Sequence, residues 1–135
     1  MLYIVRGLPG SGKSTFAHSK RFAGALVLEN DMYHIRDGVY VYQKENMPDA
    51  INWCMTACRY ALLHHMDCVV SNTFTKCLYI RQYADLANYM NTQYKVFKCV
   101  GHWNNVHNVP SPVLDAMNKQ WEDWQGEEVV DFDLT

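Results

Sequence analysis

One stretch near the N-terminus, 7–14, constrains this chain more than any other. It reads Gly-Leu-Pro-Gly-Ser-Gly-Lys-Ser and fits the pattern G-x-x-x-x-G-K-[ST], the P-loop. The apolar run 2–5 directly before it favours a buried strand, and a helix is expected to follow to about Arg21. The pattern therefore predicts a strand, a phosphate-binding turn and a helix. The alternative is a glycine-rich turn that binds nothing.

Each residue type in the motif has a physical role. Gly10 and Gly12 can take backbone angles that a side chain forbids, which leaves backbone N–H groups free to surround phosphate oxygens. Lys13 can reach the β- and γ-phosphates, Ser14 offers a hydroxyl to Mg²⁺, and the helix dipole favours the anion. The residues expected to bind a nucleoside triphosphate, ATP, with Mg²⁺ are therefore Gly10, Ser11, Gly12, Lys13, Ser14 and Thr15.

Composition bounds the remaining possibilities. The 135 residues are 49% hydrophobic and 19% charged, which predicts a single domain over 1–135 with a real core. The net charge of −2 does not indicate a general nucleic-acid binder, although a local basic groove stays open. No apolar run is long enough to span a membrane, and no secretory signal is expected. The five scattered cysteines are expected to be reduced thiols in the cytoplasm.

Apolar runs alternate with helical patterns along the chain. Strands are predicted at 2–6, 25–28, 67–72 and 94–100, and helices at 13–21, 49–66 and 76–90. Asp49 is expected to cap the second helix, and a final helix is expected to begin at Ser111 and to be stopped by Gly126. Its expected buried stripe is Leu114, Met117, Trp121 and Trp124. The acidic tail, 127–135, is expected to dock on the body as an edge strand.

This alternation predicts an α/β, three-layer P-loop NTPase fold, with a parallel sheet of about four strands flanked by helices and with a lid loop. In such folds ligands gather at the carboxyl ends of the strands. That rule selects the P-loop, Asp31, the pair Asn72 and Thr73, and the lid loop after Gly101. The long stretch from Asp31 to Pro48 lacks clear periodicity, although 39–42 is compatible with a short extended piece. The tyrosines of this stretch are either core or a substrate wall, with 33–42 as the expected lining of the acceptor pocket.

Asp31 is the candidate general base, because a carboxylate beside the γ-phosphate can accept the proton of an attacking hydroxyl. A Mg²⁺-water ligand and an N-cap are its alternative roles. Asn72 either orients a water or a phosphate, or caps the turn 71–75. The lid contains no Arg or Lys, so His107, Lys76 and Arg81 are the candidate cations for the transition state. The alternative for Lys76 and Arg81 is that they are solvated residues of the following helix.

The sequence resembles the small P-loop kinases related to the phage polynucleotide 5′-hydroxyl kinase, an AAA-type ATP-binding family. The resemblance spans Leu2 to about Trp124 and rests on 7–15, Asn-Asp-Met-Tyr at 30–33, Val-Val-Ser-Asn-Thr at 69–73 and His-Asn-Val-Pro at 107–110. It implies that Asp31 is the general base and that Lys13 and Ser14 have the P-loop roles. Three positions depart from the family: His34 replaces an arginine, Asn72 replaces an aspartate, and the lid arginine has no match.

These observations predict an ATP-dependent phosphotransferase that moves the γ-phosphate to a hydroxyl acceptor. The candidate acceptors are a nucleic-acid 5′-end, a nucleoside or another small molecule. Lys13, Asp31 and Asn72 are the expected catalytic residues, and the expected substrate-binding residues are Tyr33, His34, Thr73 and His107. The alternatives are a nucleotide-binding module or switch with slow ATP hydrolysis, and a toxin-like kinase of a sugar nucleotide.

Overall fold

A five-stranded parallel sheet forms the centre of the protein. The computed structural model describes residues 1–36, 39–40, 44–101 and 110–131. The strand order is β2-β5-β1-β6-β7, and each neighbouring pair is parallel. The strands are Leu2–Arg6 (β1), Leu26–Leu28 (β2), Cys68–Asn72 (β5), Tyr94–Cys99 (β6) and Glu128–Val130 (β7). The first four match the predicted strands, and β7 confirms that the acidic tail docks at an edge.

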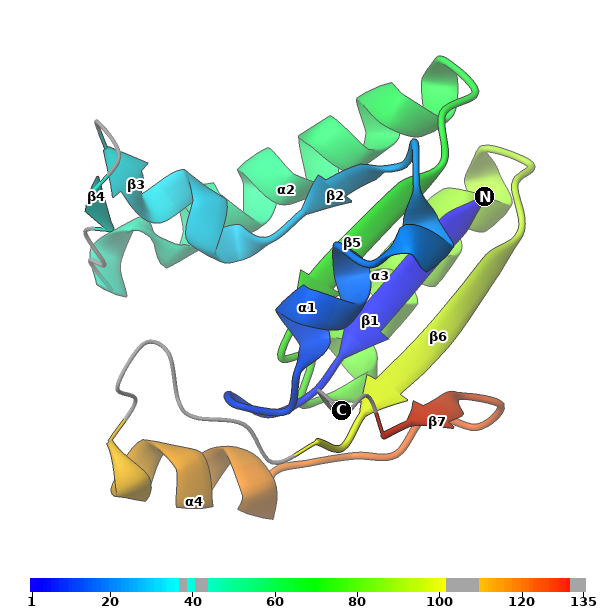
Figure 1. Cartoon of the computed structure of the whole chain (residues 1–135). Coiled ribbons are helices and arrows are strands. Elements are labelled where there is room, and N and C mark those ends of the chain that lie inside the picture. Colours follow the sequence, from blue (N-terminus) through cyan, green and yellow to red (C-terminus); the bar gives the residue numbers. More distant parts are fainter. Residues whose placement is uncertain (37–38, 41–43, 102–109, 132–135) are drawn as a thin grey trace.

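Helices cover both faces of the sheet and make the fold three-layered (Figure 1). Met47–Leu63 (α2) and Cys77–Tyr89 (α3) lie on one face, where they pack against Leu2 and Ile4 of β1. Lys13–Ala17 (α1) lies on the other face, with Val5 beneath it. Alternate residues of β1 therefore serve two cores, as expected for a central strand that is buried on both sides.

The first helix is shorter than predicted. It ends at Ala17 instead of Arg21, and a 3₁₀ helix, Lys20–Phe22 (η1), follows after the extended residue Ser19. This break brings the Phe22 ring to 5.2 Å from Phe16 and 4.9 Å from Tyr3, measured between ring centroids. Burying an aromatic side chain stabilises a fold by about 1.5–3 kcal/mol, which outweighs the helical hydrogen bonds lost at the break.

The second helix begins two residues earlier than predicted. It starts at Met47, so Asp49 lies within the first turn and is not the cap. There its negative charge still complements the positive end of the helix dipole. The buried face contains Cys54, Cys58, Ala61 and Leu62. Helical spacing in the sequence predicts that Ile51, Trp53, Tyr60 and His65 belong to the same buried stripe, but all four are exposed. The apolar stripe is narrower than the sequence indicates, because one face of the helix alone reaches the sheet.

The last helix also differs from the prediction. Ser111–Lys119 (α4) ends well before Gly126, and none of its residues is fully buried. Pro110, not Ser111, occupies the cap position. Trp121 and Trp124 therefore do not belong to a helical stripe. The chain leaves the helix because the Glu122 backbone N–H donates to the Thr75 carbonyl at 2.8 Å, a contact that a continuing helix could not make.

The irregular stretch between β2 and α2 contains short elements. They are Asn30–His34 (η2), Ile35–Arg36 (β3), Val39–Tyr40 (β4) and Lys44–Asn46 (η3). β3 and β4 pair as a two-stranded antiparallel sheet, which confirms a short extended piece near Val39. The η2 turn packs on α2, so this stretch stands beside the carboxyl end of β2.

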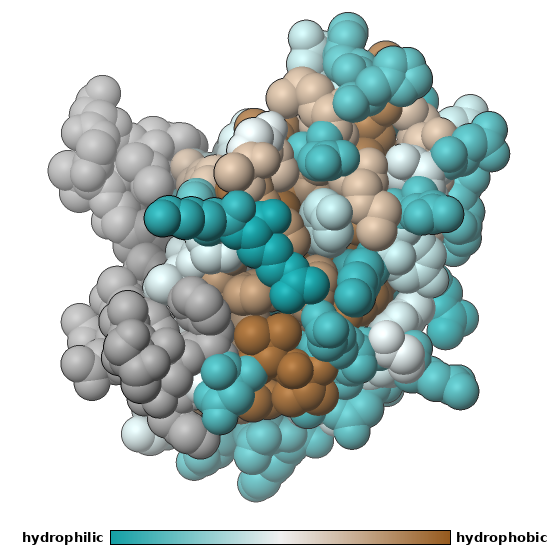
Figure 2. Space-filling model, turned by 45° about the vertical axis from the view of Figure 1, so that its right-hand side comes forward, coloured by the Kyte–Doolittle hydropathy of each residue, from teal (hydrophilic) through white to brown (hydrophobic). Residues whose placement is uncertain are grey.

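The β6–β7 side of the molecule exposes an apolar patch among hydrophilic side chains (Figure 2). Val129 of β7 is 59% exposed. The Glu128 carboxylate lies 3.5 Å from Arg21 and 3.7 Å from Lys95, so charges flank this edge strand, which discourages pairing with other strands. Within the described part of the chain, no helix is both long and apolar enough to cross a membrane.

Candidate nucleotide and phosphoryl-transfer site

The P-loop has the backbone geometry that the sequence predicts. Gly10 and Gly12 have φ angles of 82° and 87°, in the left-handed region that glycine favours. The Ser11 N–H donates to the Leu8 carbonyl at 3.0 Å, and the Gly101 N–H donates to the Ser11 carbonyl at 3.0 Å. These bonds fold the loop into a tight turn and tie it to the end of β6. Because α1 has about one and a half turns, its dipole is smaller than the predicted helix would supply.

Gly7 is required by packing. A Cβ at this position would collide with Ser11 Oγ and would lie 3.0 Å from the Cys99 carbonyl oxygen. The Gly7 N–H donates to the Thr73 carbonyl at 3.4 Å. The first glycine of the motif thus lets the loop leave β1 in close contact with the ends of β5 and β6.

Lys13 lies in a partly closed, charged environment. Burial lowers the pKa of its ammonium group below 10.5, and the nearby carboxylates of Asp31 and Glu29 oppose that shift. Asp31 therefore lies within electrostatic range of the P-loop lysine, although β5 separates the strand before Asp31 from the strand before the P-loop. Glu29 was not assigned a role from the sequence. Glu29 directly follows β2, and ligands gather at the carboxyl ends of parallel strands. That position could have identified Glu29 as a candidate site residue.

Asn72 holds the turn that carries Asp31. Its side-chain Oδ1 accepts a hydrogen bond from the Asn30 N–H at 2.7 Å, and its Nδ2 faces Cys54 Sγ at 4.0 Å. This tie joins the end of β5 to the start of η2. The sequence predicted a contact to water or phosphate, or a cap of the turn 71–75, and missed this link to Asn30.

The remaining predicted site residues occupy different places. Ser14 and Thr15 are exposed at the start of α1, and Thr73 is half-buried after β5. Tyr33 lies in η2 with its ring 6.4 Å from Trp53 of α2. His34 ends η2, and its side chain is not described. His107 and the predicted lid, 102–108, lie outside the described residues.

A cavity of about 430 Å³ opens beside the P-loop. Pro9, Gly10 and Ser11 form one wall, and the end of β6 with Trp121 and Asn118 forms the others. Ser11 is only 4% exposed, and its hydroxyl has no hydrogen-bond partner among the described residues. The cavity joins the phosphate-binding turn to the chain after α4. The sequence missed it because Trp121 was expected inside a buried helical stripe.

The chain shares its fold with solved structures that include proteins described as kinases. The TM-score is 0.62 with a gluconokinase from Sinorhizobium meliloti 1021, at 20% identity over 96% of this chain and 81% of that one. It is 0.67 with Chaetomium thermophilum Kti12 in complex with ADP-AlF3, at 12% identity over 98% and 90% of the two chains. The chain also covers 59% of a Chloroflexus aurantiacus protein assigned as a kinase, with a TM-score of 0.61 and 20% identity over 74% of this chain.

The sequence also matches a family over most of its length. The match covers residues 2–121, from the first strand to the tryptophan at the cavity. It includes the P-loop, the turn that carries Asp31 and the end of β5. The chain therefore belongs to the AAA_33 family, which is described as an AAA domain.

Proposed function

We propose that this protein is an ATP-dependent phosphotransferase that moves the γ-phosphoryl group to a hydroxyl acceptor. The observation that carries the proposal is the approach of the Asp31 carboxylate to the Lys13 ammonium group at the carboxyl edge of the sheet. A phosphate-binding cation and a carboxylate at one edge of the sheet are what phosphoryl transfer to a hydroxyl needs. The kinase folds among the similar structures support this reading.

The P-loop residues fit a triphosphate. A bound phosphate would offer acceptors to the Ser11 hydroxyl and to the loop N–H groups, and it would compensate the partly buried charge of Lys13. Ser14 would hold Mg²⁺, which supplies charge neutralisation for the phosphates. The cavity between the P-loop and Trp121 would receive the nucleoside part. The complex of Kti12 with ADP-AlF3 supports nucleotide binding on this fold.

Asp31 would act as the general base. It accepts the proton of the acceptor hydroxyl as that oxygen forms a bond to the γ-phosphorus. The bond between the γ-phosphorus and the β,γ-bridging oxygen breaks, and ADP leaves with that electron pair. Lys13 balances the charge on the transferring group, and Asn72 fixes the turn of Asp31 through Asn30. Tyr33 and His34 of η2 and Thr73 would line the acceptor side, with His107 from the lid.

The decisive experiment follows labelled γ-phosphate from ATP in the wild type and in Asp31→Asn. The acceptors to screen are DNA and RNA 5′-hydroxyl ends, which test the polynucleotide-kinase relationship, then nucleosides, sugars and sugar nucleotides. The wild type should label one class. Asp31→Asn should lose about 10²–10⁴-fold in transfer rate, as expected when a general base is removed. Its ATP affinity should stay within about twofold, because the substitution leaves the P-loop intact.

A second candidate is a nucleotide-binding switch with slow hydrolysis. It is favoured by the neutral side chain of Asn72, whose oxygen is already engaged by the Asn30 N–H. Label that appears only in free phosphate, with every acceptor, would establish this reading and reject the kinase.

The five free cysteines support a further proposal, that the protein works in a reducing compartment such as the cytoplasm.

A further inference from the structure

The guanidinium group of Arg6 is completely buried at the end of β1. Its exposed fraction is 0%, and Gly7, the first residue of the P-loop, follows it directly. A buried charge is costly unless every donor is paired, so its partners show which parts of the molecule it holds together.

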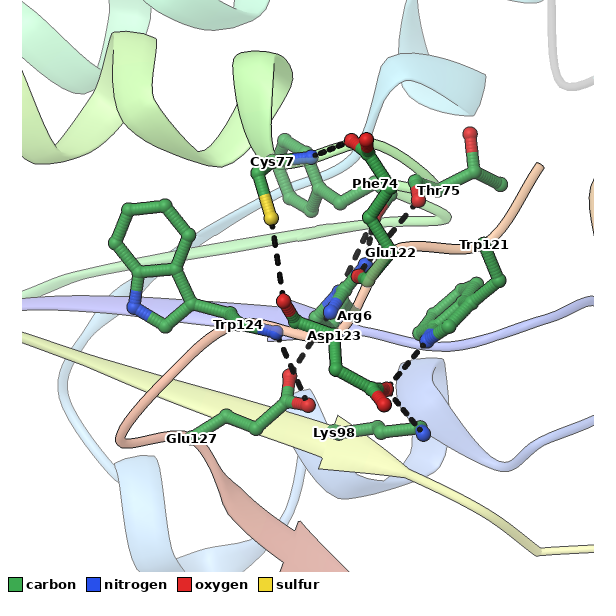
Figure 3. Close-up of polar contacts among 10 residues, drawn as sticks. All are labelled: Arg6, Phe74, Thr75, Cys77, Lys98, Trp121, Glu122, Asp123, Trp124 and Glu127. Carbon is green, nitrogen blue, oxygen red and sulfur yellow. Dashed lines mark hydrogen bonds and ion pairs between the residues drawn. The ribbon is translucent and has the colours of Figure 1, made fainter.

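Those partners come from two distant parts of the chain (Figure 3). Arg6 Nη2 donates to the Phe74 carbonyl at 2.6 Å and to the Glu122 carbonyl at 2.7 Å. Arg6 Nη1 forms an ion pair with Glu127 Oε1 at 2.9 Å, and the Glu127 side chain is 8% exposed. One guanidinium group therefore clamps residues 121–130, here named the C-terminal segment, against the carboxyl ends of β1 and β5.

The same group supports a wall of the cavity. The Arg6 Cζ atom lies 4.0 Å from the centroid of the Trp121 ring, within the range of a cation–π contact. The Trp121 Nε1–H donates to Asp123 Oδ1 at 3.2 Å, and Lys98 Nζ donates to the same oxygen at 3.1 Å. Trp121 faces the cavity that Gly10 and Ser11 also line. The position of this indole ring thus depends on Arg6 and on the C-terminal segment.

We propose that Arg6 couples nucleotide binding to docking of the C-terminal segment, so that the segment regulates the affinity of the P-loop site. The inference rests on the proposed nucleotide binding. A nucleotide that fills the cavity contacts the P-loop on one side and Trp121 on the other. It therefore favours the docked segment, and linkage requires that the docked segment favours the nucleotide equally. Arg6 is a positioning residue in this scheme.

The test combines affinity with amide hydrogen exchange on the full chain. Mg-ATP should slow exchange across residues 121–130 in the wild type. Glu127→Gln removes the charge that pairs with Arg6 and should weaken Mg-ATP binding by about fivefold or more. It should also abolish most of the protection that Mg-ATP gives to the segment. Binding measured by calorimetry supplies the affinities.

Glu128→Gln is the matched control. It removes the same charge from the neighbouring residue, whose half-exposed carboxylate pairs with Arg21 and Lys95 at the surface. The Mg-ATP affinity of this variant should equal that of the wild type. Mg-ATP should also protect residues 121–130 of this variant against hydrogen exchange as strongly as in the wild type. Where Glu127→Gln fails to fold, Trp121→Leu replaces it, because Trp121 is only partly buried. Trp121→Phe keeps a ring over Arg6 and should restore the coupling that Trp121→Leu loses.

Three results would overturn the inference, and only the last also removes nucleotide binding. If the wild type binds Mg-ATP while exchange in the segment is unchanged, or if a folded Glu127→Gln binds as tightly as the wild type, the coupling is absent and nucleotide binding stands. If the wild type binds neither Mg-ATP nor Mg-tripolyphosphate, the proposed function fails, and the coupling fails with it.

Discussion

Lys13 shows how one residue responds to both its surroundings and its expected ligand. Burial lowers the pKa of its ammonium group, while Asp31 and Glu29 counteract part of that effect. A bound phosphate would also raise the pKa of Lys13, because a nearby negative charge favours the protonated lysine. The residue is therefore a reporter of anion binding as well as a ligand.

Binding of Mg-ATP should consequently take up protons in the alkaline range below 10.5. The free protein has a lowered Lys13 pKa, so part of the lysine is neutral there, and bound phosphate raises the pKa and returns it to the charged form. Calorimetry in two buffers of different ionisation enthalpy measures this uptake. Equal heats in both buffers across that range would contradict the prediction, and Lys13→Arg, whose guanidinium group stays charged at these pH values, supplies the control without the titrating group.

The cysteines give a second prediction at this scale. Burial raises the pKa of Cys54 and of Cys99 to about 11, and Cys58 and Cys68 are 0% exposed. Only Cys77, at the start of α3, is partly exposed. At pH ~8 iodoacetamide should label the native protein rapidly at Cys77 alone, because the other four thiols are buried and shielded from the reagent. Mass spectrometry should find five labels after unfolding, and rapid labelling of a second native thiol would refute the prediction.

At the scale of elements, the Asn72 side chain joins the end of β5 to the turn that follows β2. Asn72 Oδ1 accepts from the Asn30 N–H at 2.7 Å, and Asp31 follows directly in η2. The sequence indicated that both strand ends belong to one site, because parallel strands present their carboxyl ends at one edge. It could not show that the amide of one strand end positions the turn of the other.

Asn72→Ala should therefore lower the free energy of unfolding by about 1–3 kcal/mol, because it leaves the Asn30 N–H without its acceptor. Asn72→Asp keeps a side-chain oxygen at the same distance from the backbone, so it should lower the free energy of unfolding much less. Denaturant unfolding compares the two variants. Equal stability of Asn72→Ala and the wild type would show that water replaces this contact at no cost.

On the scale of the whole molecule, the site is assembled from both ends of the chain. The P-loop follows β1, whereas Trp121 and β7 belong to the last part of the described residues. The C-terminal segment adds the fifth strand and a wall of the cavity. A ligand in this cavity would hold together parts of the chain that are more than a hundred residues apart in sequence.

Mg-ATP should therefore protect the protein against heat. At a hundredfold excess over the dissociation constant, linkage predicts about 2.7 kcal/mol of added stability, and about 5–10 °C in Tm for a domain of this size. Differential scanning fluorimetry measures the shift, and Lys13→Met should show little of it. An unchanged Tm in saturating Mg-ATP would argue against nucleotide binding itself.

Local sequence determined the alternation of strands and helices and the conformation of the P-loop. The apolar run of β1 and the positive φ angles of Gly10 and Gly12 depend on neighbouring residues, so a motif can specify them. Because alternating strands and helices form parallel sheets, it also determined that Asp31 and Asn72 lie at one edge.

Only the tertiary structure decided where the helices end and what the buried charge of Arg6 contacts. Arg6 meets Phe74 and Glu127 across sequence separations of 68 and 121 residues, and no local pattern encodes such partners. Likewise α4 ends at Lys119 because Glu122 bonds to Thr75, not because of a breaking residue. The packing of the chain determines which distant groups form hydrogen bonds and ion pairs, because every buried charge and every buried N–H group needs a partner.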